Sequence, residues 1–104
     1  MKLYYSPGAC SMASHIVLRE VGQPFEIERV DTANKTTETG ADFWAVNPKG
    51  KVPVLAVEGE VLTEGPSILQ FVADRAGDET LAPRAGTMAR ARVNELLNFT
   101  GTEL

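Results

Sequence analysis

The sequence predicts an α/β domain in which helices cover a four-stranded mixed sheet, followed by one separate helix. Three observations predict this class. Short apolar runs bounded by turn residues alternate with segments of helical periodicity. A strand, a helix and a second strand come first, which implies a parallel pair of strands. Two later runs are joined by Glu58-Gly59, a two-residue turn that implies an antiparallel pair, so the sheet is mixed.

The composition restricts the class of protein. A chain of 104 residues is long enough for one domain with one core, and 43% hydrophobic and 23% charged residues are ordinary for a globular protein in water. A net charge of −4 argues against nucleic acid as a main partner. No apolar run approaches the ~20 residues of a membrane helix, and the N-terminus lacks the pattern of a signal peptide.

The counts of cysteine and histidine are equally informative. One cysteine excludes an internal disulfide and fits a reducing compartment, so we expect a cytoplasmic protein. One histidine beside one cysteine gives no basis for a self-contained transition-metal site, and we expect no metal.

The first strand and helix are predicted in residues 2–22. Residues 3–5 form an apolar and aromatic run, residues 6–9 have turn chemistry, and a helix begins at Cys10 and Ser11 and stops at Gly22. A thiol at a helix N-terminus has a depressed pKa, because the unpaired N–H groups and the helix dipole favour an anion. From this stretch alone, the alternative interpretation of Cys10 is a small buried residue that packs under the helix.

The middle of the chain predicts a strand, then a loop, then apolar residues that belong to the core. Residues 25–30 alternate between the two sides of a strand with one wetter face, near a sheet edge. Residues 31–42 are polar and predict a surface loop or a short irregular helix. Phe43 and Trp44 are expected in the core, and residues 47–50 form a turn.

The next strand, residues 51–57, has a proline in its first half. A central strand rejects proline, so Pro53 lies at the strand start or follows a cis bond. Residues 60–63 return as an antiparallel strand. A helix then opens at residues 64–66, with Pro66 at the first helical position, and ends at Gly77.

The last part of the chain is expected to be a separate unit. Residues 1–77 form the main domain, 78–86 a linker, and 87–104 a helix whose apolar stripe needs a partner. Thr87 can cap this helix, and Arg90 falls on a face other than the apolar one. A chain that ends inside a helix suggests a fragment, or a protein completed by association. Large uncovered apolar patches are rare on monomers, so the exposed apolar stripe of this helix predicts self-association. The stripe is formed by Val93, Leu96 and Leu97.

The order of elements is thioredoxin-like, and four segments resemble the bacterial beta-class glutathione transferases. They are YYSPGACSMASHIVLRE, NPKGKVPVL, LTEGPSILQFVAD and ELLNF, in the family's order over essentially the whole chain. The resemblance covers the family's N-terminal domain and the first helix of its all-α C-terminal domain. It implies glutathione as cosubstrate, a small electrophile as second substrate and no permanently bound cofactor. With the exposed stripe, we expect a homodimer or another form of self-association.

The resemblance assigns a role to Cys10, which matches the cysteine that marks the beta class. In the family this cysteine lies beside the glutathione sulfur and can form a mixed disulfide with it. Tyr5 and Ser11 are alternative hydroxyl donors to a thiolate, although Tyr5 is more readily explained as a core residue.

The resemblance also places the rest of the tripeptide. Val52 and Pro53 match the segment before a cis-proline, where Val52 would pair with an extended peptide as an added strand. Glu64 would hold the γ-glutamyl ammonium, and the helix N-terminus at Gly65 would face its carboxylate. Many relatives have serine where Gly65 stands, so one hydroxyl contact is missing here. A charge that only stabilises the helix start is the other interpretation of Glu64.

Further residues complete the predicted site. Lys35 matches a lysine that reaches the glycyl carboxylate, and Lys49 and Lys51 could also bind that carboxylate. The remaining candidates are Asn98, which matches an asparagine of the first C-terminal-domain helix, the weaker Thr102 and Glu103, and His15, for which packing is the simpler explanation.

Three functions follow in order of preference. The first is a glutathione transferase, or its glutathione-binding domain. The second is a glutaredoxin-like monothiol exchange through Cys10, the only thiol. The third is a non-catalytic binding or interaction module of the same fold. The residues do not name the electrophile, and binding is expected to survive truncation better than conjugation.

Overall fold

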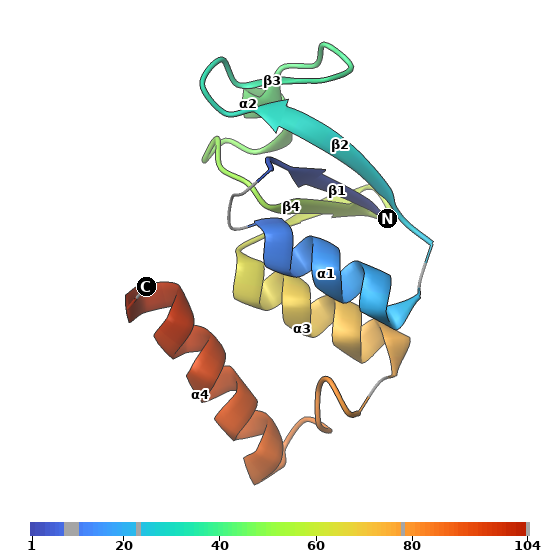
Figure 1. Ribbon diagram of the computed structural model, residues 1–104, viewed down its shortest axis with the longest axis vertical. Coiled ribbons are helices and arrows are strands. Elements are labelled where there is room, and N and C mark those ends of the chain that lie inside the picture. The colour runs from blue at the N-terminus through green and yellow to red at the C-terminus, as the bar shows by residue number, and fades with distance from the viewer. Residues whose placement is uncertain (8–10, 23, 78, 104) are drawn as a thin grey trace.

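The computed structural model describes residues 1–7, 11–22, 24–77 and 79–103, with the backbone alone at residues 11, 12 and 100–103 (Figure 1). The elements in chain order are β1 (Lys2–Tyr5), α1 (Ser11–Val21), β2 (Glu26–Asp31), β3 (Thr36–Thr37), α2 (Phe43–Val46), β4 (Val54–Val57), β5 (Glu60–Thr63), α3 (Gly65–Ala76) and α4 (Met88–Glu103). Within those described residues, no helix is long and apolar enough to cross a bilayer.

The strands form one mixed sheet in the order β3-β2-β1-β4-β5. β1 is parallel to β2 and β4 is antiparallel to β5, as the sequence predicts, and β4 is also antiparallel to β1. The predicted count of four strands is wrong, because β3 pairs with the end of β2 through Val30 and Thr37. β3 lies in the stretch expected to be a loop or irregular helix. Two threonines have no hydropathy period, and only pairing with β2 makes them a strand.

One face of the sheet carries α1 and α3 side by side (Figure 1). The residues between them and the sheet come from β1, α1, β4 and α3, and each is at most 1% exposed: Leu3, Leu18, Leu55, Ile68 and Val72. Their spacing along each helix follows the helical period, so the apolar stripes of two helices and one sheet face close a single core.

The opposite face has a smaller core beneath α2, formed by Val30, Phe43 and Val54. Phe43 is fully buried, as predicted. Trp44 is not in the core, because its side chain is 50% exposed. Its ring instead lies against Gly50, where φ is 68° and an added Cβ would come within 2.6 Å of the ring. Tryptophan here covers the turn at residues 47–50 rather than filling the interior.

The two sides of β2 are not those that hydropathy suggests. Glu28 is 3% exposed, whereas its neighbour Ile27 is 38% exposed. The Glu28 carboxylate accepts hydrogen bonds from Lys2 Nζ and Thr39 Oγ1, both at 2.7 Å. Burial alone would raise the pKa of Glu28, but the hydrogen bonds from Lys2 and from Thr37 and Thr39 lower it to about 2. A partnered carboxylate therefore takes a place that an apolar residue was expected to occupy.

The ends of α3 follow its sequence closely. Pro66 lies in the first turn, and the helix ends at Gly77, whose φ of 69° is the left-handed conformation that glycine adopts without strain. The Val52–Pro53 peptide is cis, which the strand pattern leaves as one of two alternatives and the family resemblance implies. β4 begins only at Val54, so Pro53 stands before the ladder and its missing N–H breaks no pairing.

The main polar contact between α4 and α3 in the described structure is made by Arg90. The Arg90 side chain is 8% exposed and donates to both oxygens of Asp74, at 2.8 and 2.7 Å. It also donates to the carbonyl of Pro83 at 2.9 Å. Thr87 caps the helix, because its Oγ1 accepts the N–H of Arg90 at 3.2 Å. The sequence predicts the cap but places Arg90 on an outer face, which the structure corrects.

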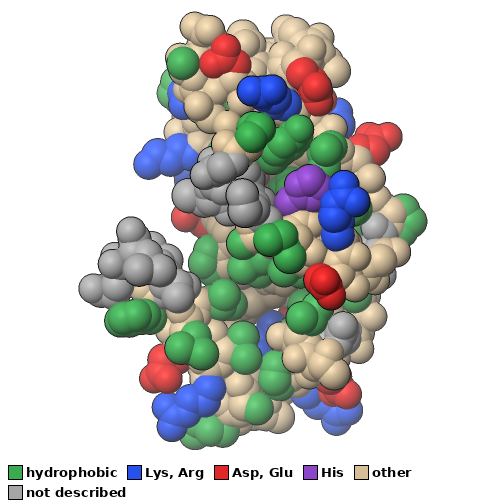
Figure 2. All heavy atoms as spheres, in the orientation of Figure 1, with side chains coloured by type: hydrophobic (Ala, Val, Ile, Leu, Met, Phe, Trp, Pro, Cys, Tyr) green, Lys and Arg blue, Asp and Glu red, His purple; other side chains and the backbone are tan. Residues whose placement is uncertain are grey.

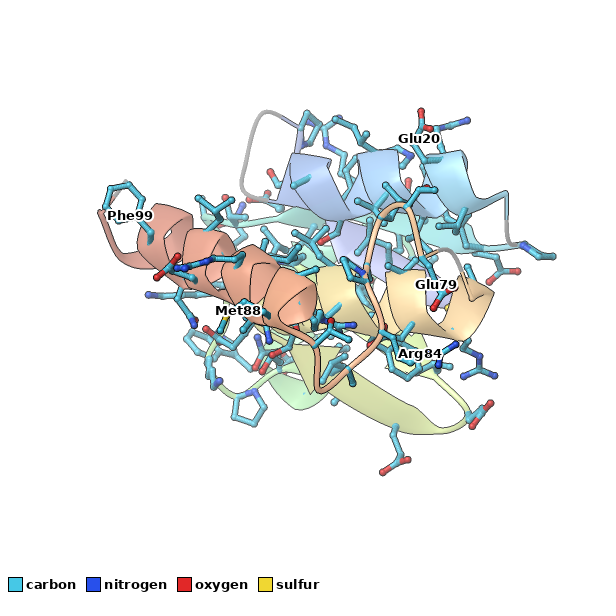
Figure 3. All side chains as sticks on the ribbon, turned by 90° about the horizontal axis from the view of Figure 1, so that it is seen from below. Glu20, Glu79, Arg84, Met88 and Phe99 are labelled. Carbon is cyan, nitrogen blue, oxygen red and sulfur yellow. The ribbon has the colours of Figure 1, made fainter. Side chains whose placement is uncertain are left out.

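The predicted exposed stripe of α4 is wrong for two of its three residues. Val93 and Leu97 are half-buried and face α1 and α3 across an apolar cavity of about 180 Å³. Leu96 is 63% exposed. The exposed apolar surface of α4 is completed by Met88 and Phe99, labelled in Figure 3, and Figure 2 shows hydrophobic side chains along this helix.

Candidate functional site

The predicted site residues of the sheet domain gather around residues 47–52, between the end of α2 and the start of β4. Lys35 reaches this turn from the loop after β2, since its Nζ donates to the carbonyl of Gly50 at 2.7 Å. The same ammonium lies 5.6 Å from the centre of the Trp44 ring. The backbone of Lys35 has φ 57°, a conformation that non-glycine residues rarely adopt. Its N–H donates to the carbonyl of Asp31 at 2.7 Å.

The loop that carries Lys35 is organised by Asp31. The Asp31 carboxylate accepts the backbone N–H groups of Ala33 and Asn34, at 3.0 and 3.1 Å, and the Asn34 side chain at 2.9 Å. These hydrogen bonds, chiefly those from Asn34, lower the pKa of Asp31. An aspartate that binds the N–H groups two and three residues later forms a tight local turn, and this turn fixes where Lys35 leaves the sheet.

The turn itself is held by Asn47, which is 2% exposed. Its side chain donates to the carbonyl of Lys51 at 2.8 Å and accepts the N–H of Lys49 at 3.0 Å. Val52 follows directly and is half-buried. Among the described residues, no backbone hydrogen bond engages its N–H or C=O. This braced turn therefore presents, beside the sheet, a Val52 peptide group that is unpaired among the described residues.

On the other side of Val52 lies Glu64, the residue before α3. Its φ of 75° holds it outside the helix, and its side chain makes no capping hydrogen bond. Instead, Glu64 Oε2 pairs with Lys49 Nζ at 3.0 Å. Gly65 begins α3 and offers only its backbone, while Pro66 has no N–H. This helix start combines an exposed carboxylate, an exposed ammonium and an N-terminal N–H.

The residues predicted to act at the sulfur are only partly covered by the described structure. Cys10 is outside the described residues, and Ser11 is the first residue of α1, with its side chain outside the description. Tyr5 ends β1, and its ring centre lies 5.8 Å from that of His15. His15 also stacks edge-on against Phe25 and accepts a hydrogen bond from Arg19 Nε at 3.3 Å. Packing and one hydrogen bond thus engage His15 on the outer side of α1.

The remaining candidates lie on α4. Asn98 is exposed in the second half of the helix. Thr102 and Glu103 belong to α4 by their backbone, and their side chains are outside the description. The structure therefore brings Lys35, Val52 and Glu64 to one turn. It places Asn98 on an element that packs against α3.

Two features of the site were not predicted from the sequence. One is the Lys49–Glu64 pair, which joins residues from two different turns. The other is the contact between Trp44 and Gly50 that supports the carbonyl bound by Lys35. The only local signal was the turn-forming run at residues 47–50. It indicates a turn but not which distant side chains meet it.

Comparison with known protein families gives a clear match. Residues 8–75, more than half of the chain, match the family model described as glutathione S-transferase, N-terminal domain. Among curated proteins, glutathione S-transferase GstA of Escherichia coli O157:H7 is 49% identical over all of this chain and 52% of its own length. Glutathione S-transferase GST-4.5 of Xanthomonas campestris is 41% identical over all of this chain and 50% of its own length.

Solved structures agree with that match. A ternary complex of BphK, described as a bacterial GST, superposes with a TM-score of 0.97 at 51% identity, over 100% of this chain and 52% of that one. A sphingomonad glutathione S-transferase complexed with glutathione gives a TM-score of 0.95 at 52% identity, over 99% and 52%. A beta-class enzyme from Sphingomonas chungbukensis gives 0.96 at 54%, over 99% and 52%. The chain spans about half the length of these relatives.

Proposed function

The chain belongs to the glutathione S-transferase family through its N-terminal domain, and on that premise we propose that it binds glutathione. In this proposal the site stabilises the glutathione thiolate for attack on a small electrophile, and glutathione is a cosubstrate rather than a resident cofactor. Cys10 lies beside the sulfur or is joined to it in a mixed disulfide. The transferase activity is part of this proposal, because the chain spans only about half the length of the relatives that carry that name.

The observation that carries the proposal is the meeting of Lys35, Val52 and Glu64 around one turn. A γ-glutamyl tripeptide needs partners for an ammonium at one end, a carboxylate at the other and peptide groups between. Glu64 suits the ammonium, and Lys35 suits the glycyl carboxylate. The free N–H and C=O of Val52 suit an extended peptide that pairs with the chain as an added strand.

The chemistry at sulfur depends on Cys10, which directly precedes the first residue of α1. A free thiol has a pKa of about 8.5, and the N-terminal end of a helix favours its thiolate. The same positive end would favour a glutathione thiolate placed beside it. With oxidised glutathione, the Cys10 thiolate would attack one sulfur of the disulfide. A Cys10–glutathione disulfide would form and one glutathione thiolate would leave.

The other candidates have secondary places in the proposal. Asn98 would complete the site from α4. Tyr5 and Ser11 would be alternative hydroxyl donors to the thiolate, and Lys51 would bind the glycyl carboxylate together with Lys35. We also infer a division into 1–77, 78–86 and 87–104, because the main buried core is formed by residues of β1, α1, β4 and α3 and α4 lies outside it. His15, Thr102 and Glu103 remain the weakest candidates.

We further infer self-association, with a homodimer as the expected form. The exposed Leu96, Met88 and Phe99 of α4 support it, because contiguous uncovered apolar surface is uncommon on monomers. The cytoplasm is the proposed compartment, because a chain with a single cysteine fits a reducing environment.

Intact-mass analysis after incubation with oxidised glutathione tests the proposal, with calorimetric titration of reduced glutathione alongside. We expect the wild type to gain one glutathionyl group and the Cys10→Ser variant to gain none, while both bind reduced glutathione. An assay with an activated aryl halide then separates conjugation from thiol exchange, since an adduct without conjugation indicates exchange. Neither adduct nor binding would contradict the proposal and favour the interaction module.

A further inference from the structure

Gln70, in the middle of α3, connects α4 with the first turn of α3 through two hydrogen bonds. Its side-chain Oε1 accepts from Arg90 Nη2 at 3.3 Å. Its side-chain Nε2 donates to the carbonyl of Pro66, one helical turn earlier, at 3.3 Å. Gln70 is half-buried and borders the apolar cavity beside α4. A polar side chain in such a place needs partners within the protein, and this amide has one at each end.

The Arg90 end of this connection is held from several directions. The guanidinium donates to both oxygens of Asp74, at 2.8 and 2.7 Å, and to the carbonyl of Pro83 at 2.9 Å. It also donates to Asn94 Oδ1 at 3.4 Å. Together with the bond to Gln70, these contacts give every nitrogen of the guanidinium an acceptor. The place of α4 therefore determines where the Gln70 amide is held.

The other end of the connection is a peptide group at the start of α3. The carbonyl of Pro66 shares that peptide group with the N–H of Ser67, and a peptide group is planar, so a partner that fixes one fixes the direction of the other. Among the residues that the structure describes, no hydrogen bond engages the Ser67 N–H. The Glu64 side chain does not cap this turn, and Pro66 has no N–H. Gln70 thus orients a free donor of the helix start.

α3 does not need this contact to satisfy its backbone. In an α-helix the carbonyl of Pro66 accepts the backbone N–H of Gln70, four positions later, so the Gln70 side chain takes only the second lone pair of that oxygen. The helix is held against the sheet by Ile68 and Val72, which are at most 1% exposed. The contact therefore adds orientation at the start of α3 rather than the apolar burial that keeps the helix in place.

We propose that Gln70 is a positioning residue that couples the place of α4 to the direction of the Ser67 N–H, so that an anionic group at the start of α3 is bound more tightly when Arg90 is in place. Gln70 does not contact the ligand and acts through the peptide group between Pro66 and Ser67. The inference rests on the proposed function, because the anionic group is the α-carboxylate at the γ-glutamyl end of glutathione. It makes the affinity for that end depend on how α4 is attached.

Calorimetric titration with two ligands tests this coupling. The ligands are S-methylglutathione, which cannot form a disulfide, and its analogue with γ-aminobutyrate in place of the γ-glutamyl group, which lacks only the α-carboxylate. We expect Gln70→Met, which nearly keeps the side-chain volume, to weaken S-methylglutathione about two- to five-fold and to leave the analogue unchanged. Arg90→Met should weaken S-methylglutathione at least as much. The double variant should bind no more weakly than Arg90→Met alone, because both residues act through one connection.

The matched control is Asn94→Ala, which removes another side-chain amide that accepts from Arg90 but lies on α4 itself. Its affinity for both ligands should equal that of the wild type. A measurement without ligand complements the titrations. In the free protein, the NMR signal of the Ser67 amide should shift in Gln70→Met, because its peptide carbonyl loses a hydrogen bond, and should stay in place in Asn94→Ala.

Several outcomes would overturn the coupling. Equal weakening of the two ligands in Gln70→Met would mean that the substitution loosens α3 in general. An unchanged Ser67 signal would mean that Gln70 does not orient this peptide group, and losses that multiply in the double variant would mean that Gln70 acts without Arg90. If the wild type binds no S-methylglutathione, the proposed function fails together with the ligand part of this inference, and the Ser67 signal alone decides whether Gln70 orients the peptide group.

Discussion

α1 and α4 are both helices that pack against α3, but they are attached in different ways. α1 contributes Leu18 to a core in which every member is at most 1% exposed. α4 is attached through the buried Arg90 guanidinium and two half-buried apolar residues that border a cavity. The difference indicates that burial of apolar surface fixes α1 to the sheet. A directional polar contact instead sets where α4 starts.

The strongest test of the apolar attachment is Leu18→Ala. Its side chain is fully buried, so we expect the free energy of unfolding to fall by about 2–5 kcal/mol through lost burial and an unfilled cavity. Urea unfolding measures the change. Ile16→Ala on the same helix is the matched control. That side chain is 53% exposed, and the loss should stay within about 0.5 kcal/mol. Equal losses in the two variants would contradict the assigned core.

A second test concerns the polar cluster inside the sheet domain. The folded pKa of Glu28 is about 2, below its ordinary value of 4.5, so its contribution to stability is present above that ordinary value. This contribution, on the order of 2 kcal/mol, should be lost as the pH falls from about 5 to 2. Urea unfolding at several pH values should show this slope in the wild type.

The matched variant for that test is Glu28→Gln. It removes the ionisable group but keeps an oxygen that can accept from Thr39. We expect it to be less stable at neutral pH by on the order of 2 kcal/mol and to show a flatter acid slope. An unchanged slope would mean that Glu28 is not the group that titrates.

The third test is aimed at the attachment of α4. Arg90→Met should lower hydrogen-exchange protection along α4 while the strands stay protected, because its partners Asp74 and Pro83 lie at the α3–α4 junction. Arg92→Met is the control, since that side chain is 68% exposed and pairs only with Glu95 among the described residues. A uniform loss of protection across the sheet would show that α4 is not a separately attached element.

The smallest effect is expected at the outer side of α4. Leu96 is 63% exposed, so Leu96→Ser should change the free energy of unfolding of the single chain by no more than about 0.5 kcal/mol. Sedimentation at high concentration should nevertheless show less association than the wild type if this surface meets a second copy. Identical sedimentation of the two proteins, both self-associated, would place the contact elsewhere.

The sequence predicted the elements whose signals are local. Gly22 and Gly77 end helices at positive φ, Thr87 caps α4, and Glu58-Gly59 turns β4 into β5. Pro53 in an apolar run left two alternatives, a place at the strand start or a cis bond, and the structure shows both, since the cis peptide stands directly before β4. Each of these depends on the chemistry of one or two residues, which is why the order of strands and helices could be read without coordinates.

Predictions that required knowing the neighbours were less successful. The alternation in β2 could not reveal that Glu28 faces Lys2 and Thr39, because a buried carboxylate is compatible with folding only when distant partners exist. Trp44 was expected inside because it is large and apolar, yet α2 contributes Phe43 and the partly buried Val46 to the core beneath it. Arg90 was placed outside because its partner on α3 is 16 residues away.

The candidate site divides in the same way. The turn at residues 47–50, the helix start after Glu64 and the position of Cys10 before a helix were all visible in the sequence. By itself the sequence therefore determined the fold class and the kinds of groups available for binding, because turns, caps and hydropathy are properties of neighbouring residues. Only the tertiary structure decided that Lys35 reaches Gly50 and that Lys49 pairs with Glu64. Those contacts join segments that the chain brings together only when the sheet and helices pack.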